Sequence, residues 1–255
     1  MALTAEMAKH IIENQRASLL QNREEERCRL ADPFAVGRWV TLQRLQREEL
    51  NGCVGMIIQD MNENGRVGVR IESCGDKLVR TCNLQPFAEE ELVKIVRCGA
   101  EGEGSRAYAG VQTWLWPRSV LEGLSREMSP VSCRIGIPLC VAKVKPCCVL
   151  EDRALWDNQR ITYLMIDTVT GLAPGRWQSH VGPVVVGRAS FQPFSCDDFW
   201  LVQNFLTHLL DKYADGAVQL SCDVTPKAFQ NSKRRSLSYE RLNPADVQQS
   251  EDVNI

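Results

Sequence analysis

The sequence lacks the spacings that usually hold a structural metal ion. Its eleven cysteines include no C-x2-C knuckle, and its three histidines, at positions 10, 180 and 208, lie far apart. An odd number of unpatterned cysteines, without a secretory signal, predicts reduced thiols, many of them buried as small apolar side chains. We therefore expect no metal centre, no disulfide framework and no cofactor.

Long apolar runs and leader-like segments are also missing. No stretch of about 18 apolar residues occurs, which argues against a membrane-spanning helix. The first residues include Glu6 and Glu13 and no apolar signal-peptide core, so we expect a cytoplasmic protein, with the nucleus as the alternative. At 255 residues, the chain is long enough for one or two domains with a substantial core.

Positive charge is not in excess either. The chain carries 30 Lys and Arg against 32 Asp and Glu, and residues 32–88 carry seven of each sign. Binding to a phosphate backbone needs a basic surplus, so nucleic acid is not favoured as a partner. A local basic patch stays open as an alternative, formed by Arg38, Arg44, Arg47, Arg66, Arg70 and Arg80.

Residues 36–87 show the pattern of a small β-barrel. Residues 54–59 alternate along a strand, and Asn64-Gly65 before a second apolar run, residues 66–71, is a strong hairpin signal. Residues 77–80 add a further strand after a turn. Four or five short strands within roughly fifty residues are too few for two stacked sheets, so we predict closure into a barrel without free edges.

The same region resembles a known module. The residues that carry the resemblance are Glu49-Leu50-Asn51-Gly52-x-x-Gly55, Gly65-Arg66-x-x-Val69 and Asn83-Leu84. They look like the SH3-like, KOW-related repeat found in many algal and protist proteins. The resemblance covers about a fifth of the chain and implies a barrel whose relatives bind protein, RNA or chromatin. Trp39 and Asn51 are its candidate binding residues.

A second resemblance lies further along the chain. Its residues are Asp157-Asn158-Gln159-x-x-Thr162-Tyr163-Leu164-Met165-Ile166-Asp167, Gly171-x-Ala173-Pro174-x-x-Trp177-Gln178 and Val181-Gly182-Pro183-Val184. They are similar to the C-terminal region of uncharacterised algal proteins that often carry a MYND zinc finger, which this chain lacks. The resemblance implies no catalytic residue. Asp157, Asn158 and Gln159 are candidate binding residues of this segment.

The rest of the chain divides around the barrel at 32–88. Residues 1–31 read as a helical arm, with one long helix from Leu3 to about Leu30 because no Gly or Pro interrupts its apolar spacing. Residues 89–105 are expected to form a linker that opens with a short helix, residues 106–230 an α+β domain with an antiparallel sheet covered by helices, and residues 231–255 a polar tail.

Within the α+β domain, several elements are predicted. Pro117 suits the first turn of a helix that reaches Glu127, and Ser195 suits the N-cap of the strongest helix, ended by Asp215-Gly216. The expected strands are Pro138 to Val144, Ile161 to Ile166 and Val184 to Val186, and a short helix starts at Thr225-Pro226.

The loop from Gly171 to Pro183 is the best candidate site in that domain. It places Trp177, Gln178 and His180 in irregular chain between two predicted strands, where recognition residues concentrate. Trp177 either plugs the core or anchors an interface. An enzyme site with Asp167 and His180 is a further alternative, although no G-x-S-x-G, H-E-x-x-H, P-loop or Rossmann motif occurs.

The tail holds one candidate modification site. Ser236 follows Lys233-Arg234-Arg235, so its phosphorylation would partly cancel a basic cluster. Taken together, the sequence predicts a non-catalytic protein that binds protein partners or organises an assembly. An RNA- or ribosome-associated factor that uses the barrel is the first alternative, and an enzyme is the second.

Overall fold

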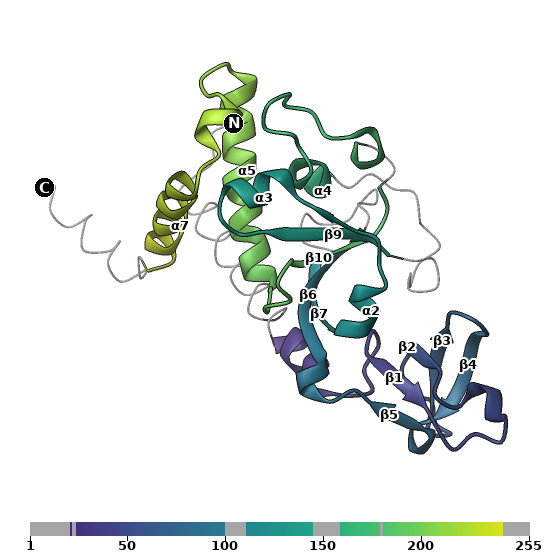
Figure 1. Ribbon diagram of the computed structural model, residues 1–255. Coiled ribbons are helices and arrows are strands. Elements are labelled where there is room, and N and C mark those ends of the chain that lie inside the picture. The colour runs from purple at the N-terminus through teal and green to yellow at the C-terminus, as the bar shows by residue number, and fades with distance from the viewer. Residues whose placement is uncertain (1–20, 22–23, 100–110, 145–158, 179–180, 242–255) are drawn as a thin grey trace, which may run out of the picture. The chain divides into compact units, whose positions relative to one another are not determined.

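The computed structural model describes residues 21, 24–99, 111–144, 159–178 and 181–241 (Figure 1). They form two compact units. Unit 1 contains residues 21, 24–93 and 112–121, and unit 2 contains residues 94–99, 111, 122–144, 159–178 and 181–241. None of the helices in these ranges is long and apolar enough to cross a membrane. The fold is α+β with two five-stranded antiparallel sheets.

The predicted hairpin in unit 1 is confirmed. Strands β2 (Val54–Gln59) and β3 (Arg66–Ile71) pair antiparallel, from Gly55 opposite Ile71 to Gln59 opposite Gly68. The turn forms because Gly65 takes a φ of +67° and the Asn62 side chain accepts hydrogen bonds from the amides of Asn64 and Arg66, at 3.0 and 3.1 Å.

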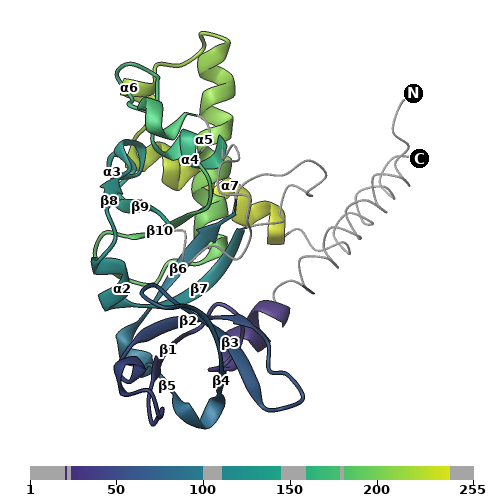
Figure 2. The same ribbon diagram turned by 90° about the vertical axis from the view of Figure 1, so that its right-hand side faces the viewer.

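The expected barrel closure is wrong. Strands β1 (Trp39–Leu42), β4 (Gly75–Arg80) and β5 (Leu84–Pro86) complete a sheet in the order β4-β3-β2-β1-β5, whose curl is visible in Figure 2. Strand β5 is only three residues long and pairs with β1. It therefore leaves β4 unpaired on its outer side, and the sheet keeps two edges.

The two faces of this sheet are buried differently. The inner face packs the cluster Val40, Leu42, Leu50, Ile57, Val67, Val69, Ile71, Val79 and Leu84. On the outer face, Trp39 lies opposite Met56 in the β1–β2 register, and both are buried. Trp116 of β7 (Val111–Pro117) contributes here, since its ring lies 5.3 Å from that of Trp39 in an edge-on contact.

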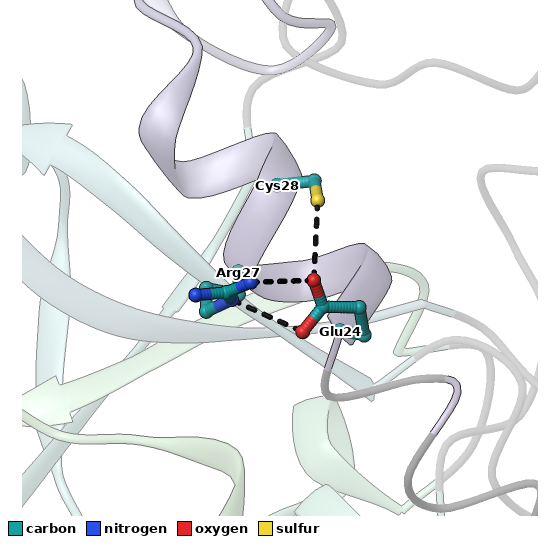
Figure 3. Close-up of polar contacts among 3 residues, drawn as sticks. All are labelled: Glu24, Arg27 and Cys28. Atoms are coloured by element: carbon teal, nitrogen blue, oxygen red, sulfur yellow. Dashed lines mark hydrogen bonds and ion pairs between the residues drawn. The ribbon is translucent and has the colours of Figure 1, made fainter.

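The structure shows no long N-terminal helix in the described residues, in which Gln21 and residues 24–31 are helical. The remainder of the expected helix lies outside them. Figure 3 shows how this turn is held: Arg27 donates to both carboxylate oxygens of Glu24, at 2.6 and 3.0 Å, and the Cys28 thiol lies 3.8 Å from one of them. These contacts are exposed and local, so they support the helix without forming a site.

The second sheet has the order β7-β6-β10-β9-β8. Its other strands are β6 (Leu92–Cys98), β10 (Val184–Arg188), β9 (Leu139–Lys143) and β8 (Arg126–Met128). Strands β9 and β10 confirm two predicted strands. Strand β6 occupies residues expected in a linker, after a 3-10 turn at Glu89–Glu91. The helix predicted from Pro117 to Glu127 is shorter, because α2 (Arg118–Glu122) ends before β8 begins.

The strongest predicted helix is confirmed as α5 (Cys196–Ala214), capped by Ser195 and ended at Asp215. Its apolar stripe packs on the sheet of unit 2 (Figure 1). The other helices are α3 (Pro130–Arg134), α4 (Gln159–Leu164), α6 (Leu220–Asp223) and α7 (Pro226–Arg241), the last much longer than expected. Short 3-10 turns occur at Glu48–Leu50, Thr81–Asn83 and Gly175–Trp177.

One predicted strand is wrong. Ile161 to Ile166 has β-branched and aromatic composition, yet residues 159–164 form helix α4. Ile161 and Leu164 are both fully buried, at the spacing of one helical turn. The Gln203 side chain of α5 donates to the backbone carbonyl of Arg160, at 2.9 Å. Packing against α5 therefore outweighs the local strand preference.

Candidate functional site

The most exposed apolar side chains of unit 2 lie around a short loop, residues 167–172. Asp167 closes this loop on itself: its carboxylate accepts from the amides of Val169 and Thr170, at 2.8 and 2.9 Å. The backbone carbonyl of Asp167 accepts from the Gly171 amide at 2.8 Å, and the Asp167 amide donates to the Leu172 carbonyl at 3.0 Å. Gly171 has a φ of +72°, which the turn requires. The loop is therefore held by its own hydrogen bonds.

This loop turns two aliphatic side chains outward. Val169 is 80% exposed and Leu172 is 66% exposed, while Tyr213 near the end of α5 is 40% exposed. The Tyr213 ring lies directly against Gly171, because a Cβ added there would overlap the phenol. We call Val169, Leu172 and Tyr213 the loop patch. The loop patch is the candidate docking surface of unit 2.

The base of the loop patch is tied to two other helices. The Arg134 guanidinium of α3 donates to the Thr168 hydroxyl, at 2.9 Å, and to the Ser221 carbonyl of α6, at 2.5 Å. Beneath them lies a small apolar pocket lined by Val131, Tyr163, Ile166, Thr168, Leu206, Leu209, Leu210, Leu220 and Val224. It has room for about one water molecule. The pocket is too small for a metabolite.

Charged residues of both signs lie in the segments that form the loop patch. Asp167 lies in the loop, near Arg134 of α3, while Asp211 and Lys212 lie in the last turn of α5 and Asp215 is its C-cap. Lys212 is the charge that suits the C-terminal end of the helix dipole, whereas Asp211 and Asp215 oppose it.

The carboxylate of Asp167 gives the loop a pH dependence. The amide of Thr170 and then that of Val169 lower the pKa of Asp167 below its ordinary value of 3.8. A lowered pKa means that these bonds persist above pH 3.8 and are lost as the pH falls through the folded-state value. We expect the amide resonances of Val169 and Thr170 to titrate together with a midpoint below 3.8. In an Asp167→Asn control they should not titrate, and a midpoint above 3.8 would contradict the loop geometry.

The structure places the predicted residues of unit 1 in structural roles. Trp39 is 9% exposed and packs on Trp116. The Asn51 side chain accepts from the Leu45 amide at 2.9 Å and donates to the Leu45 carbonyl at 3.1 Å, which closes a loop onto itself. Trp39 is therefore part of the packed sheet, and Asn51 is an exposed residue that holds the loop to Leu45.

In unit 2, Trp177 is 1% exposed and belongs to the core. Its indole N–H donates to the Glu127 carboxylate at 3.0 Å, and the same oxygen pairs with Arg176 at 2.5 Å. Gln178 is exposed and donates to the Ala173 carbonyl. Thr162 of α4 donates to the Trp177 carbonyl at 2.6 Å, so the structure brings α4 and the Trp177 turn together.

The other predicted residues contribute less. Gln159 is exposed at the start of α4, and the side chain of Ser236 in α7 lies outside the described residues, as do Asp157, Asn158 and His180. Among the residues with described side chains, no group of three or more His, Cys, Asp or Glu could hold a metal ion.

Sequence reasoning missed Val169, Leu172 and Tyr213. A signal was present: Asp167 and Gly171 bracket Thr168-Val169-Thr170, and an Asp that precedes a Thr and a Gly in this way favours a side-chain-capped turn. A capped turn that carries a valine at its tip must expose it. The long-range contact with Tyr213 has no such signal.

Comparisons with known proteins add no family. No protein-family model matches the sequence, no curated protein matches it, and no solved structure matches it. The resemblances of residues 36–87 and of the C-terminal region therefore stay predictions. Any function of the loop patch has to follow from its own geometry.

Proposed function

We propose that the protein is a non-catalytic interaction protein whose unit 2 binds a protein partner through the loop patch. The observation that carries this proposal is the exposure of Val169 and Leu172 on a loop that Asp167 orders in advance. A rigid loop binds without the entropic cost of ordering, so the burial of its apolar side chains contributes fully to affinity.

The chemistry of the surface supports protein over other partners. The patch offers two aliphatic side chains and one phenol, and tyrosine is enriched among residues that dominate binding energy. The chain carries 30 Lys and Arg against 32 Asp and Glu, and the lack of a basic surplus disfavours a phosphate backbone. The adjoining pocket holds no more than about one water molecule, which disfavours a small-molecule ligand.

The proposal predicts a large effect from removing two side chains. Burial of a Val or Leu stabilises an interface by about 1.5 kcal/mol or more, so a Val169→Ser, Leu172→Ser double variant should weaken partner binding by about 3 kcal/mol, roughly a hundredfold. Both residues are exposed, so the free energy of unfolding should change by less than about 0.5 kcal/mol.

The measurement is affinity capture from native extract with quantitative mass spectrometry, followed by a titration of each captured protein. Met61→Ser is the matched control, because Met61 is a similarly exposed apolar residue in unit 1. Partners that the double variant loses and the control keeps would support the proposal. Equal capture by all three proteins would contradict it.

A further inference from the structure

Strand β4 leaves an unusual edge on unit 1. It is six residues long and pairs with β3 without a bulge, from Arg66 opposite Arg80 to Ile71 opposite Gly75. It is the end strand of its sheet, next to β3 in Figure 1. In the strand order, β4 has β3 as its single neighbour, and its Arg80 end leads into the 3-10 turn Thr81–Asn83. A regular, unpaired edge of this length is a template for another strand.

The exposed face of β4 carries an ordered set of side chains. Asp76, Leu78 and Arg80 alternate along the strand and point to the solvent side, whereas Val79 points to the core. Leu78 is 53% exposed, and its cross-strand neighbour Gly68 offers no side chain to cover it. The face therefore reads acidic, apolar, basic at regular spacing.

The two charges of this face differ in their present partners. Asp76 accepts two hydrogen bonds from Arg70, at 2.6 and 2.8 Å, while its side chain stays 51% exposed. Arg80 lies directly opposite Arg66, so two like charges face each other across the ladder. Such a pair is destabilising unless an anion lies nearby.

We propose that the β4 edge pairs with the β4 edge of a second copy of this chain. Antiparallel pairing about Leu78 places Leu78 against Leu78 of the second copy. It then places Asp76 against Arg80 of the second copy, and Arg80 against Asp76 of the second copy. The order acidic, apolar, basic is complementary to itself under this two-fold relation, which is what an isologous interface requires.

The register fits the rest of the sheet. In this register, the solvent-facing side chains of β4 lie opposite solvent-facing side chains of the second copy. The buried faces of the two sheets then stay on the same side, whereas a slip of one residue would place Leu78 opposite an inward-facing residue. A carboxylate from the second copy also approaches the opposed Arg66 and Arg80 and reduces their repulsion. The contact involves one strand from each copy, well below a standard interface, so the dimer is weak and depends on concentration.

The test is sedimentation velocity of the full chain across a concentration series. The wild-type protein should shift from monomer to dimer, and Arg80→Glu should stay monomeric because both charges of its face are acidic. Asp76→Lys should stay monomeric for the opposite reason. An equimolar mixture of the two variants should dimerise again, because the lysine at position 76 of one variant then faces the glutamate at position 80 of the other. Arg47→Glu, an exposed reversal elsewhere in unit 1, is the control and should dimerise like wild type.

A second variant separates self-pairing from loss of fold. Leu78→Glu should abolish the dimer while thermal melting and amide spectra stay close to those of the wild type, since Leu78 contributes no core contact. A wild-type protein that is monomeric at the highest concentration would overturn the proposal. So would a dimer that survives Arg80→Glu, or a variant mixture that fails to associate although both variants are folded.

Discussion

Replacing Trp177 with alanine is expected to lower the free energy of unfolding by about 4 kcal/mol. The side chain is 1% exposed and contributes to the large apolar cluster of unit 2. Its removal would leave a cavity between α4 and the sheet and would take one hydrogen-bond donor from the Glu127 carboxylate. Denaturant unfolding monitored by circular dichroism measures the change.

The conservative variant distinguishes packing from hydrogen bonding. Trp177→Phe keeps a buried aromatic ring and loses the indole N–H and part of the ring volume, so it should cost less than Trp177→Ala, about 2 kcal/mol. Glu127 keeps its pair with Arg176 in this variant. If Trp177→Ala unfolded at the same denaturant concentration as wild type, Trp177 would be an accessible anchor instead, and the core assignment would be wrong.

Gly37→Ala is the second substitution with a large expected effect. Gly37 has a φ of +90°, and a Cβ there would lie within 2.8 Å of three ring carbons of Trp114. Trp114 is buried, and the Arg29 guanidinium lies 5.4 Å from the centre of its ring. We expect a loss of about 3 kcal/mol, from backbone strain and overpacking together.

Gly52→Ala is the matched control for this substitution. Gly52 has a similar φ of +85°, but a Cβ there would meet nothing within 4 Å. It should therefore cost only the backbone strain, about 1 kcal/mol. The difference between the two variants, measured by thermal unfolding, reports the packing of the Trp114 ring on Gly37 within unit 1. Equal losses would show that the Trp114 ring does not lie on Gly37.

Local signals predicted the best-defined elements. The Ser195 cap and an apolar stripe of period 3.6 predicted the start and the end of α5. The Asn64-Gly65 turn between two apolar runs predicted the strands β2 and β3 with the bounds that the structure has. In both cases the turn or cap chemistry and the apolar spacing agree, and each interaction lies within a few residues. The fold class and the antiparallel sheets followed from these elements.

Non-local packing decided the elements that were predicted wrongly. Residues 161–166 have strand composition, yet they are helical because Ile161 and Leu164 meet α5. Residues 92–98 have an apolar alternation after three glutamates, and they join the second sheet as β6 instead of forming a linker. The barrel stays open because β5 is too short to pair on both sides. None of these outcomes is encoded within one window of sequence.

The site was the least predictable part. Aromatic residues were expected at a binding surface, but Trp39 and Trp177 are buried because each has an apolar neighbour to cover it. Gly171 of the loop packs against Tyr213, which lies more than forty positions further along the chain. The exposure of Val169 and Leu172 depends on this non-local contact. Sequence alone indicates the turn, whereas only the assembled fold shows which side chains it leaves in water.

Site-specific photo-crosslinking tests the central claim most directly. The photoreactive residue p-benzoylphenylalanine replaces Val169 at the tip of the loop patch, or Met61 in unit 1 as the control. Irradiation in native extract should give a discrete crosslinked protein from position 169, absent at position 61 and lost when Leu172→Ser is added. Crosslinks that are equal at both positions, or none at position 169, would contradict a partner-binding role for the loop patch.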